Sequence, residues 1–201
     1  MHKEIFSQEQ AKMFPLLKSF ADDFFLVGGT AIALQLGHRQ SIDFDLASGK
    51  EIDAMEIRSK LKKIGKIEMV LRNTKEEFTV IINGIKWTFF CYPFAVRPLK
   101  KIDGAIRTPD LLALAAMKAY ALGRRAKWKD YVDLYFIARK YKSINPIIKK
   151  AKQIFKNEFN EKSFRAQLSY FKDVDYSEEV FFLKGEKISD KEIKEGLTDL
   201  C

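Results

Sequence analysis

FFLVGGTAIALQLGHRQSIDFDLA, residues 24–47, combines two apolar segments with a pair of glycines and a pair of aspartates. Its apolar run at 24–27 predicts a short buried strand, which two glycines end. Residues 30–37 predict a short helix, and residues 41–47 predict a second strand because apolar and polar side chains alternate along them. A strand, a glycine turn, a helix and an acidic strand in this order indicate a mixed α/β fold.

Two carboxylates project from one side of the second predicted strand. Side chains alternate between the two faces of a strand, so Asp43 and Asp45 share one face. We expect Ile42, Phe44 and Leu46 to be buried on the opposite face. Like charges this close are costly unless they share a cation, and Mg²⁺ binds through one or two carboxylates together with substrate phosphates. The pair indicates a metal site; the simpler alternative is a half-exposed strand with an acidic outer face.

The residues around this strand are suited to binding a triphosphate. Gly28 and Gly29 let the backbone approach a ligand and expose the amide groups at a helix N-terminus, which favour anions. Thr30 adds a hydroxyl donor that is also suited to capping the helix. Arg39 has the planar fork that pairs with phosphate, and Ser41 is placed to bond a triphosphate oxygen or a ribose. The alternative is an ordinary tight turn between a strand and a helix.

A predicted helix at 108–122 carries an unusual charge. Thr108 is placed to cap it and Pro109 suits its first position, and the segment LLALAAMKAYAL is apolar or aromatic apart from Lys118. A lysine on such a helix must extend to solvent or reach a buried anion. Phosphate is a candidate partner because a point charge on a long side chain suits a mobile triphosphate.

The next predicted helix, 127–141, contains Asp130 and Asp133, which lie three residues apart and are therefore neighbours on its surface. Asp130 shares a side with apolar residues, so we expect it to point toward protein. One interpretation is an ion pair with a lysine or arginine of residues 124–129. The functional alternatives are a carboxylate that orients Lys118 and a base that activates an acceptor hydroxyl.

The remaining elements divide the chain into two predicted domains. Residues 1–96 predict a mixed α/β core, and residues 97–201 predict a mainly helical domain that contributes Lys118 and Asp130 and ends in an acidic segment, 173–201. The other expected features are helices at 7–22 (with Ser7 as cap and Pro15 as an irregularity), 51–64, 144–172 and 189–197, strands at 66–72, 77–83 and 85–93, a hairpin turn at Asn83-Gly84, and His38 as a helix cap or surface residue.

Positive charge is concentrated in the middle of the chain. The 201 residues carry a net charge of +9, of which residues 97–172 contribute +13 and residues 173–201 contribute −5. A basic block of this kind suits a polyanion such as RNA, and solvated lysine-rich helix faces are the alternative. The acidic segment either shields the basic block or is itself solvated.

Several features favour a cytoplasmic protein. No apolar run approaches the roughly 18–20 residues that span a bilayer, and the N-terminal MHKEIFSQEQ lacks the order of a signal peptide. Cys91 and Cys201 form no disulfide framework, which agrees with a reducing compartment. We therefore expect no membrane partner.

Four blocks of the sequence together resemble the nucleotidyltransferase-like toxins of the AbiEii/AbiGii type. The blocks are GGT at 28–30, HRQSIDFDL at 38–46, AMK at 116–118 and KDYVDLY at 129–135, and their order and spacing are kept. The resemblance implies an α+β fold: a polymerase-β-like nucleotidyltransferase core, with a mixed twisted sheet and flanking helices, followed by a helical C-terminal domain. It also implies transfer of a nucleotide from an NTP, with Mg²⁺ or Mn²⁺ as cofactor and pyrophosphate as the leaving group.

The same resemblance implies a biological role and a set of site residues. Members of this family act as toxins of toxin–antitoxin or abortive-infection systems, some add nucleotides to the 3′ end of tRNA, and the usual partner is a winged-helix antitoxin. By residue, the resemblance implies metal binding by Asp43 and Asp45, nucleotide binding by Gly28, Gly29, Thr30 and Ser41, a phosphate contact by Lys118, and a catalytic carboxylate at Asp130.

One position departs from the wider nucleotidyltransferase pattern. Those enzymes commonly place a third metal-site carboxylate on a later strand, and the corresponding position in IKWTFFCYP is Thr88. Residues 85–93 contain no Asp or Glu. Either Asp130 substitutes for this carboxylate, or metal binding rests on two carboxylates.

The leading hypothesis is therefore a toxin that transfers a nucleotide from an NTP to RNA, with tRNA as the expected acceptor. A second hypothesis has the same chemistry and a small molecule or a protein hydroxyl as acceptor. A third is a binding module that holds a nucleotide without turnover. The charged residues Asp43, Asp45 and Lys118 on apolar elements argue against the third.

Overall fold

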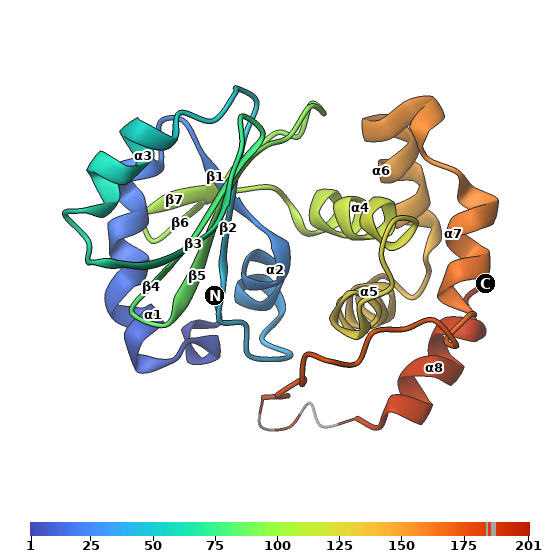
Figure 1. Cartoon of the computed structure of the whole chain (residues 1–201). Coiled ribbons are helices and arrows are strands. Elements are labelled where there is room, and N and C mark those ends of the chain that lie inside the picture. The colour runs from blue at the N-terminus through green and yellow to red at the C-terminus, as the bar shows by residue number, and fades with distance from the viewer. Residues whose placement is uncertain (184, 186–187) are drawn as a thin grey trace.

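The computed structural model describes residues 1–183, 185 and 188–201 (Figure 1). Its centre is a mixed five-stranded sheet of order β1-β2-β5-β4-β3, in which β2 and β5 are parallel and the other neighbours are antiparallel. The strands are β1 Phe25–Val27, β2 Phe44–Ser48, β3 Ile67–Asn73, β4 Glu77–Ile82 and β5 Ile85–Cys91, with a separate pair β6 Lys100–Ile102 and β7 Ile106–Thr108. The predicted mixed α/β class is confirmed.

A buried helix joins the sheet to the helical half of the chain. α2 Gly28–Leu36 lies between the sheet and the pair α4 Leu111–Leu122 and α5 Trp128–Tyr141 (Figure 1). It is apolar on all sides because it is covered from both directions. The other helices are α1 Gln8–Met13, η2 Phe14–Phe20, α3 Ala54–Leu61, α6 Asn145–Phe155, α7 Glu161–Leu168 and α8 Asp190–Thr198, with short 3₁₀ turns at Lys3–Ile5 and Lys156–Glu158.

The alternation along β5 separates the core from the side of the sheet that faces α2 and α4. Ile85, Trp87 and Phe89 are buried in the core. The Trp87 ring packs edge-on against Phe44 of β2, with ring centroids 4.8 Å apart. The residues between them, Lys86 among them, project to the opposite face. The polar side chains of β5 therefore lie on the face of the sheet that is directed toward α2 and α4.

The start of β2 differs from the prediction. The strand begins at Phe44 and not at residue 41, so Asp43 lies in the preceding loop, and Ile42 is 55% exposed and not buried. The reason is that the backbone before Phe44 bonds to side chains and to a distant segment and not to a neighbouring strand. Gln10 donates to the Ser41 carbonyl oxygen at 2.8 Å, and the Gln40 amide donates to the carbonyl of Phe181 at 2.8 Å.

Two predicted helix starts are also corrected. α4 begins at Leu111 with Asp110 as its cap, whose carboxylate accepts from the Ala113 amide at 2.7 Å. Thr108 does not cap this helix because it pairs with Lys100 as the last residue of β7. α2 begins at Gly28 and not at residue 30, so the glycines form its first turn.

Two predicted helix caps and a predicted turn are confirmed, whereas the helix predicted at 144–172 is divided into α6, a 3₁₀ turn and α7. Ser7 and Ser189 each form a capping box at the start of a helix, and the helix after Ser7 changes to 3₁₀ geometry beside Pro15. Asn83 and Gly84 both have positive φ angles, of 49° and 69°, as a two-residue hairpin turn requires.

The β6–β7 pair, although it follows residue 96, packs against β1 and η2 of the first half. The predicted division at 96/97 stays a prediction. Residues 184, 186 and 187 of the predicted acidic segment lie outside the described residues. Within the described part of the chain, no helix combines the length and the apolar character needed to cross a bilayer.

Candidate active site

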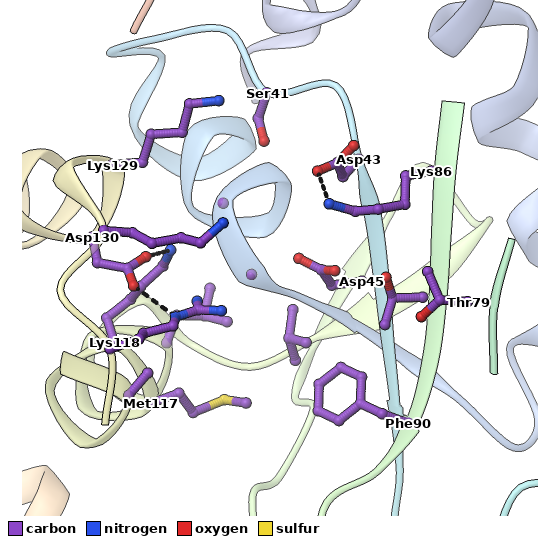
Figure 2. A pocket seen from close by; sticks show the side chains of 18 of the residues that line it. Ser41, Asp43, Asp45, Thr79, Lys86, Phe90, Met117, Lys118, Lys129 and Asp130 are labelled. Carbon is purple, nitrogen blue, oxygen red and sulfur yellow. Dashed lines mark hydrogen bonds and ion pairs between the residues drawn. The ribbon is translucent and has the colours of Figure 1, made fainter. Parts of the chain in front are cut away.

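A cavity of about 740 Å³ lies between the sheet and the helices α4 and α5 (Figure 2). The N-terminus of α2 opens into it, and β2 and β5 form one wall. One part of the wall is charged, and another is apolar and aromatic. The residues predicted from the sequence that line it are Gly28, Gly29, Arg39, Ser41, Asp43, Asp45, Lys118 and Asp130.

The two aspartates lie side by side on the sheet wall. Asp45 is in β2, in register with Thr88 on the parallel strand β5, and the correspondence of Thr88 to the third carboxylate of other nucleotidyltransferases stays a prediction. Burial, and then the negative charge of Asp43, raise the pKa of Asp45. Asp43 has a cationic partner: its Oδ2 lies 2.7 Å from the Nζ of Lys86, which reaches across from β5 (Figure 2).

The glycines at the start of α2 are required by close approach. Gly28 has a φ of +71°, and a Cβ atom there would lie 2.1 Å from Oδ2 of Asp45. A Cβ at Gly29 would lie 2.6 Å from Nη2 of Arg39 and 3.1 Å from Oγ of Ser41. The absence of side chains therefore lets Asp45, Arg39 and Ser41 pack directly against the first turn of α2, and both glycines line the cavity. A helix N-terminus at a cavity wall favours an anion.

Thr30 is buried behind this site. Its hydroxyl donates to the carbonyl oxygen of Asp43 and lies 2.9 Å from the Ser41 hydroxyl oxygen. Thr30 thus holds the loop that carries Ser41 and Asp43 against α2. Its predicted contact with a nucleotide stays a prediction.

Lys118 forms the opposite wall with Asp130. The ammonium group, almost fully buried, pairs with Oδ1 of Asp130 and lies 3.1 Å from Oδ2 of Asp133. Burial disfavours the charged lysine, but the two carboxylates outweigh it and raise the pKa of Lys118. The second oxygen of Asp130 accepts from Arg125 at 3.0 Å, so both oxygens of Asp130 are occupied by cations.

Asp133 is the centre of a buried charge cluster. It has no exposed surface, and Arg39 binds it through both edges of its fork, with Nε 2.8 Å from Oδ1 and Nη2 2.9 Å from Oδ2. Burial would raise the pKa of Asp133, but Arg39 and Lys118 hold it well below its ordinary value. The role of Arg39 as a nucleotide ligand stays a prediction, because this pairing uses most of its fork.

His38 belongs to the same cluster, so the expectation of a helix cap or surface residue is wrong. It is 1% exposed, and its Nε2 lies 2.8 Å from Oδ1 of Asp133. Burial lowers its pKa, against the opposing effect of Asp133, and the neutral ring donates from Nε2. Its ring packs against Phe136 of α5, with centroids 4.9 Å apart, so the loop after α2 is anchored to the helical half.

Part of the acidic segment reaches the rim of the cavity. Glu178 pairs with Lys127 and lies 3.2 Å from the Nζ of Lys129. These pairs lower its pKa to about 2. The backbone on either side bonds to α5 and to the loop after α2, with the Trp128 amide donating to the Asp175 carbonyl at 3.0 Å. Glu178 of the acidic segment therefore neutralises part of the basic block at Lys127 and Lys129.

The remaining wall is apolar and aromatic. It is formed by Phe90 of β5, by Tyr92 directly after that strand, and by Met117 and Tyr120 of α4. Burial raises the pKa of Tyr92, so its hydroxyl stays protonated. A cavity with one acidic and cationic part and one aromatic part accommodates a ligand that combines phosphates with a flat ring.

Sequence reasoning missed Lys86 and Glu178 as cavity residues and left Asp133 out of the predicted site. The alternation along β5 would have placed Lys86 on the same face as Thr88. The three-residue spacing from Asp130 was the available signal for Asp133. Glu178 had no comparable signal, because the fold of residues 173–183 is set by long-range contacts. Among the described residues, no group of three or more His, Cys, Asp or Glu side chains is arranged to hold a metal ion.

Comparison with known proteins agrees with this geometry. The family model described as "Nucleotidyl transferase AbiEii toxin, Type IV TA system" matches residues 16–105 and 93–194. An uncharacterized protein of Aquifex aeolicus (strain VF5) is 34% identical over an alignment of 137 residues, and the match covers 64% of this chain and 66%, just under two thirds, of that protein.

Solved structures share the fold at low identity. A putative nucleotidyltransferase from Helicobacter pylori has a TM-score of 0.61 at 16% identity, covering 97% of this chain and 94% of its own. MenT4, a nucleotidyltransferase toxin from Mycobacterium tuberculosis H37Rv, has a TM-score of 0.63 at 12% identity, covering 95% and 80%. With the family model spanning nearly the whole sequence, the chain belongs to the AbiEii nucleotidyltransferase toxin family.

Proposed function

We propose that this chain is a Mg²⁺-dependent toxin that transfers a nucleotide from an NTP to the 3′ end of tRNA. The observation that carries the proposal is the convergence of three elements on one cavity: the carboxylates Asp43 and Asp45, the amide end of α2 at Gly28, and the ammonium of Lys118. In the reaction, the acceptor hydroxyl bonds to the α-phosphorus of the NTP while the bond to pyrophosphate breaks.

The donor set fits a divalent cation. Asp43 and Asp45 offer hard carboxylate oxygens and both line the cavity, and the missing Cβ at Gly28 lets Asp45 pack directly against the first turn of α2. These two residues would hold Mg²⁺ or Mn²⁺, which when bound would neutralise charge on the triphosphate and the leaving pyrophosphate.

The chain's own residues have distinct roles in this proposal. The amides at Gly28 and Gly29 and the hydroxyl of Ser41 bind the triphosphate, and Lys118 contacts a phosphate from the opposite wall. Arg39 and Thr30 hold the loop that carries Ser41 and Asp43. The double engagement of Asp130 with Lys118 and Arg125 supports the positioning alternative for this carboxylate over the role of base.

The acceptor is inferred from charge. Residues 97–172 carry a net +13, and affinity for RNA rests largely on neutralising phosphates. The description of the family as a toxin of a toxin–antitoxin system supports an antitoxin as partner, which we propose to be a winged-helix protein. We propose the cytoplasm as the site of activity because NTP and tRNA are both found there.

The test is incubation of the purified chain with each labelled NTP, Mg²⁺ and total tRNA, beside Asp45→Ala and the exposed control Asp22→Ala. We expect label at the tRNA 3′ end with the wild-type chain and the control, and none with Asp45→Ala. Label on protein or on small molecules would show that the acceptor is not tRNA. Saturable NTP binding without transfer to any acceptor would refute catalysis, and full activity of Asp43→Asn would refute the two-carboxylate metal site.

A further inference from the structure

Lys86 is a cation built into the carboxylate site. It lies on β5 two residues before Thr88, and both side chains line the cavity because they share a face of the strand. Its Nζ lies 2.7 Å from Oδ2 of Asp43, on the side toward Asp45 (Figure 2). The strand that carries a neutral threonine beside Asp45 thus also carries a positive charge beside Asp43.

The charge balance at this place favours a single divalent ion. Asp43 and Asp45 bring two negative charges, and Lys86 already neutralises one of them. Two divalent ions about 4 Å apart, as in two-metal enzymes, need more negative charge than this to offset their mutual repulsion. A third carboxylate would supply it, but the residue in register with Asp45 is Thr88. The described residues also contain no three-residue metal cluster.

We propose that the ammonium of Lys86 takes the place of the second metal ion, so that the chain binds one divalent cation together with the nucleotide. This inference rests on the proposed function, since it concerns the same site. Asp45, with the other oxygen of Asp43, holds the single ion, and Lys86 keeps a positive charge beside Oδ2 of Asp43, on the side toward Asp45. Removing this charge opens the second position to a metal.

The alternative is an ordinary surface ion pair. Lys86 is 39% exposed, and an exposed pair contributes little to stability and has no effect on metal binding. The two readings differ in the number of metal ions bound, which is measurable without turnover.

The experiment counts Mn²⁺ bound to the full chain by electron paramagnetic resonance and calorimetry. Titrations are made without nucleotide and with each of the four α,β-methylene nucleoside triphosphates. The variants are Lys86→Met, Thr88→Asp with Lys86→Met, and the charge-matched control Lys101→Met, an exposed residue of β6 outside the cavity wall.

We expect one Mn²⁺ per chain with bound nucleotide in the wild type and the control. We expect two in Lys86→Met, bound more tightly still when Thr88→Asp adds the missing carboxylate. Without nucleotide, Lys86→Met should bind Mn²⁺ about tenfold more tightly than the control, because a like charge next to the ion has been removed.

Two Mn²⁺ ions in the wild type, or a Lys86→Met chain that matches the control, would overturn the inference. A failure of every nucleotide analogue to bind would refute the proposed function instead. In that case the titrations without nucleotide would still decide whether Lys86 excludes a metal ion.

Discussion

Replacing Asp133 by asparagine should destabilise the protein severely without changing the shape of the side chain. The carboxylate has no exposed surface and receives both edges of the Arg39 fork, with a further contact from Lys118 at 3.1 Å. Asparagine keeps one acceptor oxygen but removes the charge. Lys118 keeps Asp130 as a partner, whereas the guanidinium of Arg39, 2% exposed, is left as a buried charge without a counter-ion.

The expected loss follows from breaking a buried pair on one side, which costs about 3–5 kcal/mol. This is a large part of the roughly 5–15 kcal/mol that stabilises a typical domain. For a chain of this length, each kcal/mol lowers Tm by about 2–4 °C, so Asp133→Asn should lower Tm by about 6–20 °C at pH 7.

The assay is thermal unfolding followed by circular dichroism, with the exposed Asp199→Asn as control. The pKa of Asp133 lies well below 3.8 in the folded chain, so its contribution is complete above that pH and is lost as the pH falls through the folded value. The difference in Tm between wild type and Asp133→Asn should therefore be constant from pH 7 to about pH 4.5 and shrink on further acidification. A Tm within about 2 °C of wild type at pH 7 would refute the reasoning, because the charge cluster would then contribute nothing net.

Three further changes test the cavity. Asp45→Asn should abolish nucleotide transfer but raise Tm at pH 7 in metal-free buffer. Burial and the charge of Asp43 raise the pKa of Asp45, so its ionised form destabilises the folded chain. The gain in Tm should vanish below pH 3.8, where the carboxyl is protonated in both the folded and the unfolded chain. Gly28→Ala should cost about 1–2 kcal/mol from the left-handed backbone alone and lose activity by displacing the Asp45 carboxylate, whereas Gly49→Ala, with open space around it, should behave as wild type in calorimetry and transfer assays. Glu178→Gln should release Lys127 and Lys129 at the rim of the cavity and raise the affinity for tRNA in filter binding. The slope of log K against log salt concentration should become more negative by about one to two. An unchanged slope would show that these lysines do not contact phosphate.

Local sequence signals predicted most of the fold because they act over a few residues. The capping boxes at Ser7 and Ser189 and the turn at Asn83-Gly84 depend on chemistry within four residues. The errors occurred where distant contacts override such signals. Thr108 has a side chain that is suited to capping a helix, but it pairs with Lys100 and is therefore the last residue of β7. The helix cap is Asp110 instead.

The sequence predicted most of the residues that line the cavity, but not which of them form ion pairs with one another. Strand alternation placed Asp45 in the cavity wall, and the glycines were identified because only glycine permits so close an approach of the backbone. What no local pattern specified is the pairing of residues about 94 positions apart, such as Arg39 with Asp133. A forked cation suits a phosphate and a buried carboxylate equally well, so only the tertiary fold decides between them.

The buried charge cluster links the two walls of the cavity to each other. Arg39 comes from the loop that carries Ser41 and Asp43, while Lys118 and Asp133 come from the helices of the opposite wall. One carboxylate therefore fixes the position of the loop that carries Asp43 relative to Lys118. Hydrophobic packing alone would permit small shifts between the sheet and the helices, but a bidentate pair in a medium of low dielectric does not, because each displaced hydrogen bond leaves an unsatisfied buried charge. The charges that are most costly to bury are thus the ones that keep the two walls of the cavity at a fixed distance.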